Sequence, residues 1–218
     1  MVDSELIGSC ELFGNTSWAL QFIRGALSFS FLIGTFYVGK RWVESDPRCN
    51  TVWVMDIGKQ AIGAGLSHAL NLVASLCFTM HDEETEECMW YFMNSLIEAL
   101  LGTLMCYALL LAVEQMKWPG TMFGYYGLPP SWRLWRYQVY IWGLIVFVMK
   151  IALFTAVILF NRAISLVGDV LLSPLDYSPA LKLALIMVAA PILLSGTTFW
   201  VTDNFLRSAY TPFEPLLA

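Results

Sequence analysis

Polar and ionisable residues interrupt the apolar stretches of this sequence, and their types would suit ion binding, ligand binding or proton transfer. They are Asp56, Lys59, Gln60, His68, Asn71, Asn94, Glu98, Lys150, Asp203 and Asn204. Ionisable groups are costly inside a bilayer, so they are expected to face one another or a polar cavity. We refer to this set as the intramembrane polar cluster and treat it as the candidate site.

The spacing of these residues between positions 53 and 78 places most of them on one face of a helix. With about 100° of rotation per residue, an arc of roughly 120° holds several of them. The arc contains Asp56, Lys59, Gln60, Gly63, Ser67 and Asn71, with His68 at its edge. Ala61, Gly65 and Ala69 form a neighbouring row of small residues, a pattern that lets another helix approach closely.

Depth along the predicted helices divides the cluster into two groups. With a rise of 1.5 Å per residue, Asn94 lies roughly 6 Å and Glu98 roughly 12 Å below one membrane surface. His68 and Asn71 reach a similar depth, as do Lys150 and Arg24, so Glu98 is expected to pair with one of these two cations. The second group lies near the opposite surface, where Asp56 and Lys59 begin one helix while Asp203 and Asn204 end another.

Several interpretations of the cluster follow from these residue types. The groups either fasten helices together through hydrogen bonds or line a cavity for an ion, a lipid headgroup or a small substrate. His68 with Glu98 would in principle form an acid–base pair. The sequence identifies no nucleophile or oxyanion hole, and one histidine is not a metal site. We therefore predict no catalytic residue, no metal and no cofactor.

Composition explains why these residues have to be placed within a membrane. Of the 218 residues, 58% are hydrophobic and 13% are charged, against about 25% charged in soluble domains. Each apolar run extends over about 20 residues, the length that crosses a bilayer. The net charge of −5 argues against binding to nucleic acid, which requires a basic surface.

The apolar runs predict an all-α integral membrane protein, a bundle of about five transmembrane helices. The predicted spans cover residues 18–38, 53–78, 90–113, 137–160 and 181–205. They define a transmembrane domain over residues 18–206, an N-terminal arm over 1–17 and a short tail over 207–218.

The distribution of lysine and arginine predicts the orientation of the bundle. Seven of these residues lie on one side, and they are Lys40, Arg41, Arg48, Lys117, Arg133, Arg136 and Arg207. Arg162 and Lys182 lie on the other side. Because cytosolic loops carry the excess of positive charge, we expect a lumenal N-terminus and a cytosolic C-terminus. Cys10 and Cys88 then both lie in the lumen, where they form a disulfide or remain two free thiols.

The same residues carry a family resemblance. The segment Asp56-Ile57-Gly58-Lys59-Gln60-Ala61-Ile62-Gly63, followed by His68 and Asn71, resembles the second-helix signature of the STIMATE family. Phe123-Gly124-Tyr125-Tyr126-Gly127 is similar to the segment that follows the third helix in that family. The stretch from Leu181 to Leu206, with Phe199-Trp200-Val201-Thr202-Asp203-Asn204, resembles its last helix.

The resemblance implies a multi-pass protein of the endoplasmic reticulum or another endomembrane. Such a protein is expected to be non-enzymatic and to regulate store-operated calcium entry or the organisation of membrane contacts. The implied partners are membrane lipids and the calcium sensor STIM or another membrane protein. The polar cluster keeps two other functions open, namely a small ion or lipid channel or transporter, and an accessory subunit of a larger membrane complex.

Overall fold

The computed structural model describes residues 34, 49–79, 87–118 and 120–206. Within these ranges the chain consists of helices and their connections and contains no strand, which confirms the all-α prediction. The expected N-terminal arm, the helix over residues 18–38, the tail over 207–218, Arg24 and the Cys10–Cys88 pairing lie outside the described residues.

Four of the predicted spans correspond to long helical segments. They are α2 (Asn50–Thr79), the run of α3 (Glu87–Ile97), η1 (Glu98–Gly102) and α4 (Thr103–Gln115), then α5 (Trp132–Leu159), and the run of α7 (Pro179–Ala184), η3 (Leu185–Ala189) and α8 (Ala190–Leu206). The elements η1 and η3 are turns of π-helix inside longer helices.

Two helices within the described residues have the length and apolar character needed to cross a membrane. They are Met89–Gln115 and Trp132–Leu159, of 27 and 28 residues. In the most apolar 18-residue stretch of each helix, only 22% (Met89–Gln115) and 39% (Trp132–Leu159) is buried within the protein. Most of their apolar side chains therefore face outward, as expected of helices that contact lipid rather than a soluble core. The total of five spans and the orientation stay predictions.

The sequence analysis did not predict one short helix. Residues 161–180 were treated as a loop between two spans, but Asn161–Leu172 forms α6 and Ser173–Leu175 a 3₁₀ turn. α6 packs on α3 through Gly168, where a Cβ atom would lie 3.0 Å from Met89 Cγ and 3.2 Å from Met93 Cγ. Leu172 is also buried, whereas Leu166 and Val170 are exposed.

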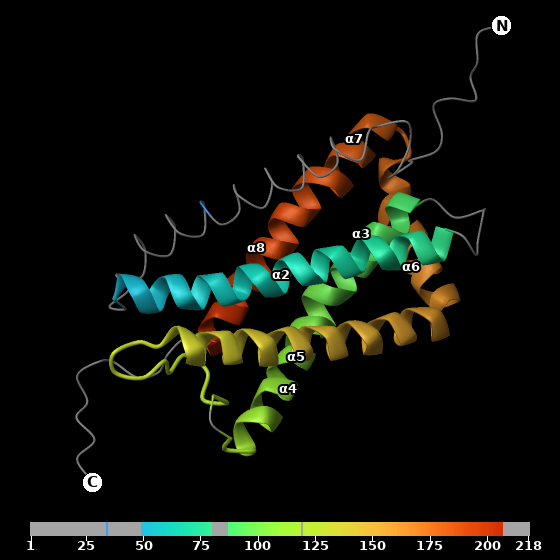
Figure 1. Cartoon of the computed structure of the whole chain (residues 1–218). Helices are drawn as coiled ribbons and strands as arrows, with labels where there is room; N and C mark the ends of the chain where they lie inside the picture. Colours follow the sequence, from blue (N-terminus) through green and yellow to red (C-terminus); the bar gives the residue numbers. More distant parts are fainter. Residues whose placement is uncertain (1–33, 35–48, 80–86, 119, 207–218) are drawn as a thin grey trace, which may run out of the picture.

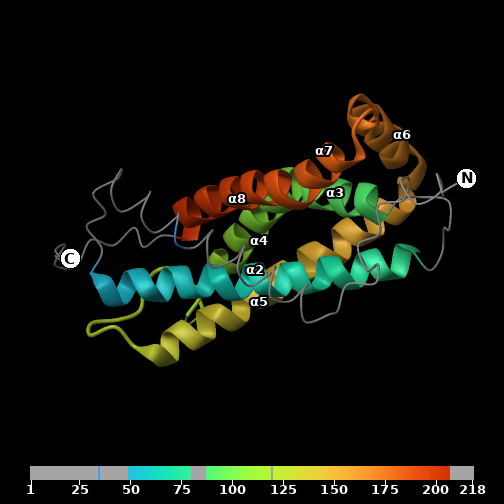
Figure 2. The ribbon, with the colours of Figure 1, turned by 90° about the horizontal axis from the view of Figure 1, so that it is seen from above.

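The long helices form a bundle in which α2 and α5 lie side by side and run in the same direction, while the α3–α4 run and the α7–α8 run return in the opposite direction (Figure 1 and Figure 2). α8 contacts α2, α3 and α4, and α4 also packs on α5. The start of α2, the start of α5, the loop after α4 and the end of α8 meet at one end of the bundle, because hydrogen bonds connect Asp56 with Tyr126, Lys59 with Gln138 and Gln60 with Asp203.

The close approach to α2 occurs on a different face from the one expected. Among the described residues, no atom lies within 4 Å of the position that a Cβ on Gly65 would occupy. On Gly63, by contrast, a Cβ would lie 2.3 Å from Trp142 Nε1 of α5. The polar face of α2, rather than the Ala61–Gly65–Ala69 row, therefore faces its neighbour among the described helices.

Candidate functional site

The structure contains two polar networks, and a cavity borders the second of them. We name them the loop network (Asp56, Lys59, Tyr126 and Gln138) and the Glu98 network (Ser67, Asn71, Asn94, Glu98 and Lys150). The central cavity has a volume of about 140 Å³ and lies between α2, the α3–α4 run, α5 and α8. Gln60 and Asn71 both line it, so it extends along roughly 16 Å of α2 at 1.5 Å per residue.

The loop network begins with an ion pair that is closed off from solvent. Lys59 Nζ lies 3.5 Å from Asp56 Oδ1, and both side chains have 0% exposure. The Tyr126 hydroxyl donates to the same carboxylate oxygen at 2.6 Å. Lys59 Nζ also lies 5.2 Å from the ring centroids of Phe123 and Tyr126, a distance at which an aromatic face attracts a cation.

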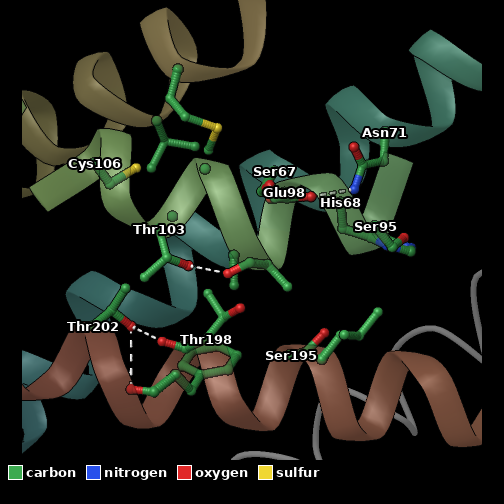
Figure 3. A pocket seen from close by; sticks show the side chains of 18 of the residues that line it. Ser67, His68, Asn71, Ser95, Glu98, Thr103, Cys106, Ser195, Thr198 and Thr202 are labelled. Atoms are coloured by element: carbon green, nitrogen blue, oxygen red, sulfur yellow. Dashed lines mark hydrogen bonds between the residues drawn. The ribbon is translucent and has the colours of Figure 1, made fainter. Parts of the chain in front are cut away.

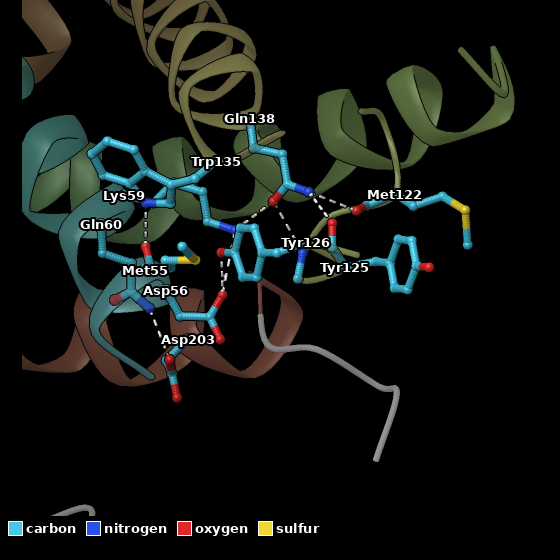
Figure 4. A network of polar contacts seen from close by, with 11 residues as sticks. Met55, Asp56, Lys59, Gln60, Met122, Tyr125, Tyr126, Trp135, Gln138 and Asp203 are labelled. Carbon is cyan, nitrogen blue, oxygen red and sulfur yellow. Dashed lines mark hydrogen bonds and ion pairs between the residues drawn. The ribbon is translucent and has the colours of Figure 1, made fainter. Parts of the chain in front are cut away.

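Gln138 connects this ion pair to the loop after α4 (Figure 4). Its Oε1 accepts from Lys59 Nζ at 3.1 Å and from the Gly124 amide at 3.2 Å. Its Nε2 donates to the carbonyls of Met122 and Tyr125 at 2.9 and 2.8 Å. One buried amide therefore holds three backbone groups of the loop against α5.

The loop reaches these partners through glycine conformations. Gly124 and Gly127 have φ values of 79° and 84°, in the left-handed region that favours residues without a Cβ. The chain then enters α5, where Ser131 caps the helix by accepting from the Arg133 amide at 3.3 Å. The Phe123–Gly127 segment is thus folded so that Tyr126 enters the bundle.

The Glu98 network joins the middle of three helices. Lys150 Nζ of α5 lies 2.5 Å from Glu98 Oε2, so the expected pairing with this cation is present. Asn71 Nδ2 donates to Glu98 Oε2 at 2.7 Å, and the Ser67 hydroxyl donates to Glu98 Oε1. Asn71 Oδ1 in turn accepts from Lys150 Nζ at 2.6 Å and from Asn94 Nδ2 at 2.8 Å.

Glu98 lies where the helix changes its winding. It is the first residue of the π-helical turn η1, which ends at Gly102. A Cβ on Gly102 would lie 3.1 Å from Met149 Sδ, so its absence lets α5 pack closely at this turn. Single π-helical turns inside α-helices occur frequently at functional sites.

The central cavity has a charged end and a neutral polar end (Figure 3). Glu98, His68 and Asn71 line the charged end, whereas Gln60 and Trp142 line the neutral polar end. Hydroxyl groups lie along the walls, from Ser67, Ser95, Thr103, Ser195, Thr198 and Thr202. Apolar side chains such as Met149 and Phe199 complete the lining, which therefore suits a small ligand with both polar and apolar parts.

The predicted residues do not all share one site. His68 lines the cavity but is otherwise exposed. Asp203 is fully buried and accepts from Gln60, whereas Asn204 is exposed at the end of α8. Asp56 and Lys59 lie in the loop network, away from the residues that line the cavity. Of the two predicted groups, the structure brings Asn71, Asn94, Glu98 and Lys150 together in one and Asp56 with Lys59 in the other.

Sequence reasoning missed the partners that come from aromatic and amide side chains. Gln138 was not singled out, although it is a fully buried polar residue in the first part of an apolar helix. Tyr126 was noted only through the family segment, and Trp142 was not distinguished from aromatic residues that face lipid. Within the described ranges no group of three or more His, Cys, Asp or Glu side chains is placed to hold a metal.

The fold and the polar interior define the class of this chain, an α-helical membrane protein with a polar-lined bundle. Comparison with protein families gives a match to the STIMATE family over residues 88–208, more than half of the chain. The chain therefore belongs to the STIMATE family. The matched range begins after α2, so the Asp56–Gly63 segment lies outside it.

A curated relative supports the membrane assignment. The chain is 25% identical to a vacuolar membrane protein of Saccharomyces cerevisiae over 222 residues, which covers 91% of this chain and 80% of that protein. No solved structure matches the chain. Family and relative together indicate a multi-pass endomembrane protein.

Proposed function

We propose that this chain is a non-enzymatic endomembrane regulator of store-operated calcium entry or membrane-contact organisation, and that the central cavity is its working site. The observation that carries the proposal is the cavity itself, which Glu98 and His68 line from different helices. The calcium-related role and a location in the endoplasmic reticulum follow from the STIMATE family resemblance rather than from the geometry.

The end of the bundle that holds the loop network is the proposed contact surface for a partner. Lys117, Arg133 and Arg136 are exposed there, as are Trp118 and Trp132 with 68% and 55% of their surface accessible. Basic and aromatic side chains of this kind bind anionic headgroups and acidic protein segments. We propose that this surface faces the cytosol and contacts acidic lipids together with STIM or another membrane protein.

Replacement of the native copy in cells tests the regulatory role. Cells that lack the chain should show altered calcium entry after store depletion, measured with a cytosolic calcium indicator, and the wild-type chain should restore it. Lys117→Gln combined with Arg133→Gln should restore it only partly, whereas Arg162→Gln combined with Lys182→Gln, at the other end of the bundle, should restore it fully. Unchanged calcium entry in cells without the chain would contradict the proposal.

The second candidate function is a small channel or transporter for an ion or a polar solute. The observation that favours it is the length of the cavity, which joins the partly buried Glu98 carboxylate at one end to Gln60 at the other. Purified protein in liposomes should then carry a monovalent cation or proton flux that Glu98→Gln abolishes. Liposomes that show no flux above the level of Glu98→Gln would exclude transport and leave the regulatory proposal standing.

A further inference from the structure

The neutral end of the central cavity contains two buried polar atoms that have no partner among the described residues. They are Gln60 Oε1, an acceptor, and Trp142 Nε1, a donor. The two residues are only 3% and 4% exposed, and both line the cavity. A buried polar atom without a hydrogen bond costs about 1–3 kcal/mol, so two such atoms on one cavity point to an occupant.

The orientation of Gln60 is fixed by a second carboxylate. Gln60 Nε2 donates to Asp203 Oδ1 at 2.9 Å, and Asp203 is fully buried. With the amide rotated by 180°, its oxygen would face the Asp203 carboxylate, and both atoms would be acceptors. Asp203 therefore keeps the donor side of Gln60 occupied and leaves its oxygen available.

The indole of Trp142, which belongs to α5, packs against α2 close to Gln60. Its Nε1 lies so close to Gly63 that a Cβ there would come within 2.3 Å. Gly63 follows Gln60 by three residues, and residues at this spacing are neighbours on one helix face, about 5–6 Å apart. The available donor and the available acceptor thus lie about one helical turn apart on one wall of the cavity.

The two atoms together require a group that both accepts and donates a hydrogen bond, and a hydroxyl does both through a single oxygen. A hydroxyl oxygen accepts one hydrogen bond and donates another, so one group can satisfy both the indole and the amide oxygen. An ammonium group or metal cation would satisfy Gln60 but not the indole N–H, and an anion or carbonyl would satisfy only Trp142. We propose that Gln60 and Trp142, positioned by Asp203 and Gly63, form a hydroxyl-binding site inside the bundle.

The size of the cavity indicates more than a single water molecule. Its volume of about 140 Å³ exceeds the ~30 Å³ that one water occupies in the liquid. Beyond the polar end it is lined by Val146, Met149 and Phe199, which suit the carbon skeleton next to an alcohol. The hydroxyl therefore belongs to a membrane alcohol such as a sterol or diacylglycerol, and water is the other source of the same chemistry.

This inference deepens the proposed working site, since it names the chemical class that the cavity binds. It does not depend on calcium regulation or on transport. Hydroxyl-dependent binding by a chain that changes neither calcium entry nor liposome flux would leave the hydroxyl site standing and overturn only the function proposed above.

Photo-crosslinking of the purified full chain tests the site. The probes are diazirine-bearing sterol and diacylglycerol analogues in phosphatidylcholine vesicles. Labelling should be competed more weakly, by about two- to tenfold, by the ester or ketone than by the parent alcohol, because each of these loses one of the two hydrogen bonds. Trp142→Phe, which keeps a ring but removes the N–H donor, should weaken competition by about two- to tenfold, the loss expected for one hydrogen bond. Trp200→Phe, at an exposed position of α8 that does not line the cavity, is the matched control and should bind as the wild type.

A second measurement separates water from a lipid alcohol and does not depend on a variant that folds poorly. In the 15N-tryptophan-labelled protein, the Trp142 indole proton should show a magnetisation transfer to a hydroxyl. Transfer to water, without hydroxyl-dependent crosslinking, would support the site with water as its occupant. No hydroxyl-dependent crosslinking and no transfer to any hydroxyl proton would overturn the proposal.

Discussion

The loop network and the Glu98 network hold buried charge in different ways. In the loop network Asp56, Lys59 and Gln138 all have 0% exposure, and partners come from aromatic rings and backbone carbonyls. In the Glu98 network the Glu98 side chain is 18% exposed and faces the central cavity. A closed network can only stabilise the fold, whereas one that faces a cavity can also contact a ligand.

Both networks lie on the same helix, so the difference arises from what packs against α2. At its start the loop after α4 returns and covers the polar face with Tyr126 and Phe123. One to three turns later, α5, η1 and α8 leave space between them. The comparison therefore assigns the stabilisation of helix packing to the start of α2 and ligand binding to its middle.

The largest expected effect is on the closed ion pair. Lys59→Met removes the cation that lies 3.5 Å from the buried Asp56 carboxylate, and breaking a buried pair in this way costs about 3–5 kcal/mol. We expect poor accumulation and a strongly lowered melting temperature in detergent. The matched control is Lys182→Met, because Lys182 pairs with Asp176 at 3.0 Å but Asp176 is 61% exposed, and exposed pairs contribute about 0–1 kcal/mol. Equal effects of the two variants would contradict the assignment.

A smaller loss of stability is expected when one hydrogen bond of the loop network is removed. Tyr126→Phe deletes the hydroxyl that donates to Asp56 at 2.6 Å, a change worth about 1–3 kcal/mol for a buried polar group. Tyr140→Phe is the control, since Tyr140 is 74% exposed. Thermal unfolding of the two variants in the same detergent measures the difference, and the prediction fails if Tyr126→Phe is as stable as Tyr140→Phe.

The Glu98 network should tolerate loss of its charge better. Glu98→Gln keeps an oxygen that accepts from Lys150 and Asn71, and its amide NH₂ can donate to the Ser67 hydroxyl, so mainly the charge-assisted part of these bonds is lost, about 1–2 kcal/mol. The protein should accumulate and localise normally while its function in cells is lost. Fluorescence-detected size-exclusion chromatography checks the folded amount, and aggregation of Glu98→Gln as severe as that of Lys59→Met would remove the distinction between the networks.

The smallest effect on stability is expected at His68. Its side chain lines the cavity but is otherwise exposed, and substitutions at such positions change stability by about 0.5 kcal/mol or less. His68→Ala should nevertheless reduce calcium entry per accumulated molecule. Full restoration of calcium entry by His68→Ala would show that the imidazole has no part in the working site.

The sequence was sufficient for features that depend on regular helical geometry. The apolar runs located four long helices within a few residues, and the helical phase of Asp56, Lys59 and Gln60 showed which face of α2 lies inward. The rise per residue placed Glu98 level with Lys150, and the two side chains form an ion pair. Periodicity alone determines these relations, because each residue's depth and direction follow from its position in a helix.

Features that depend on loops and local distortion were not predictable in this way. The return of Tyr126 into the bundle depends on glycines with positive φ in a loop that has no periodicity. The π-helical turn at Glu98 has no sequence pattern that distinguishes it from regular helix. Trp142 differs from the lipid-facing aromatic residues only through its contact with Gly63 on another helix, which a single sequence does not reveal.

The most direct test of the account compares Glu98→Gln with Tyr126→Phe in cells where each replaces the native copy. The measurement is calcium entry after store depletion, divided by the amount of folded protein at its membrane. The account predicts that Glu98→Gln loses most of this ratio, because the cavity is the working site. Tyr126→Phe should keep the wild-type ratio while its amount falls. A normal ratio for Glu98→Gln together with a reduced ratio for Tyr126→Phe would contradict the account.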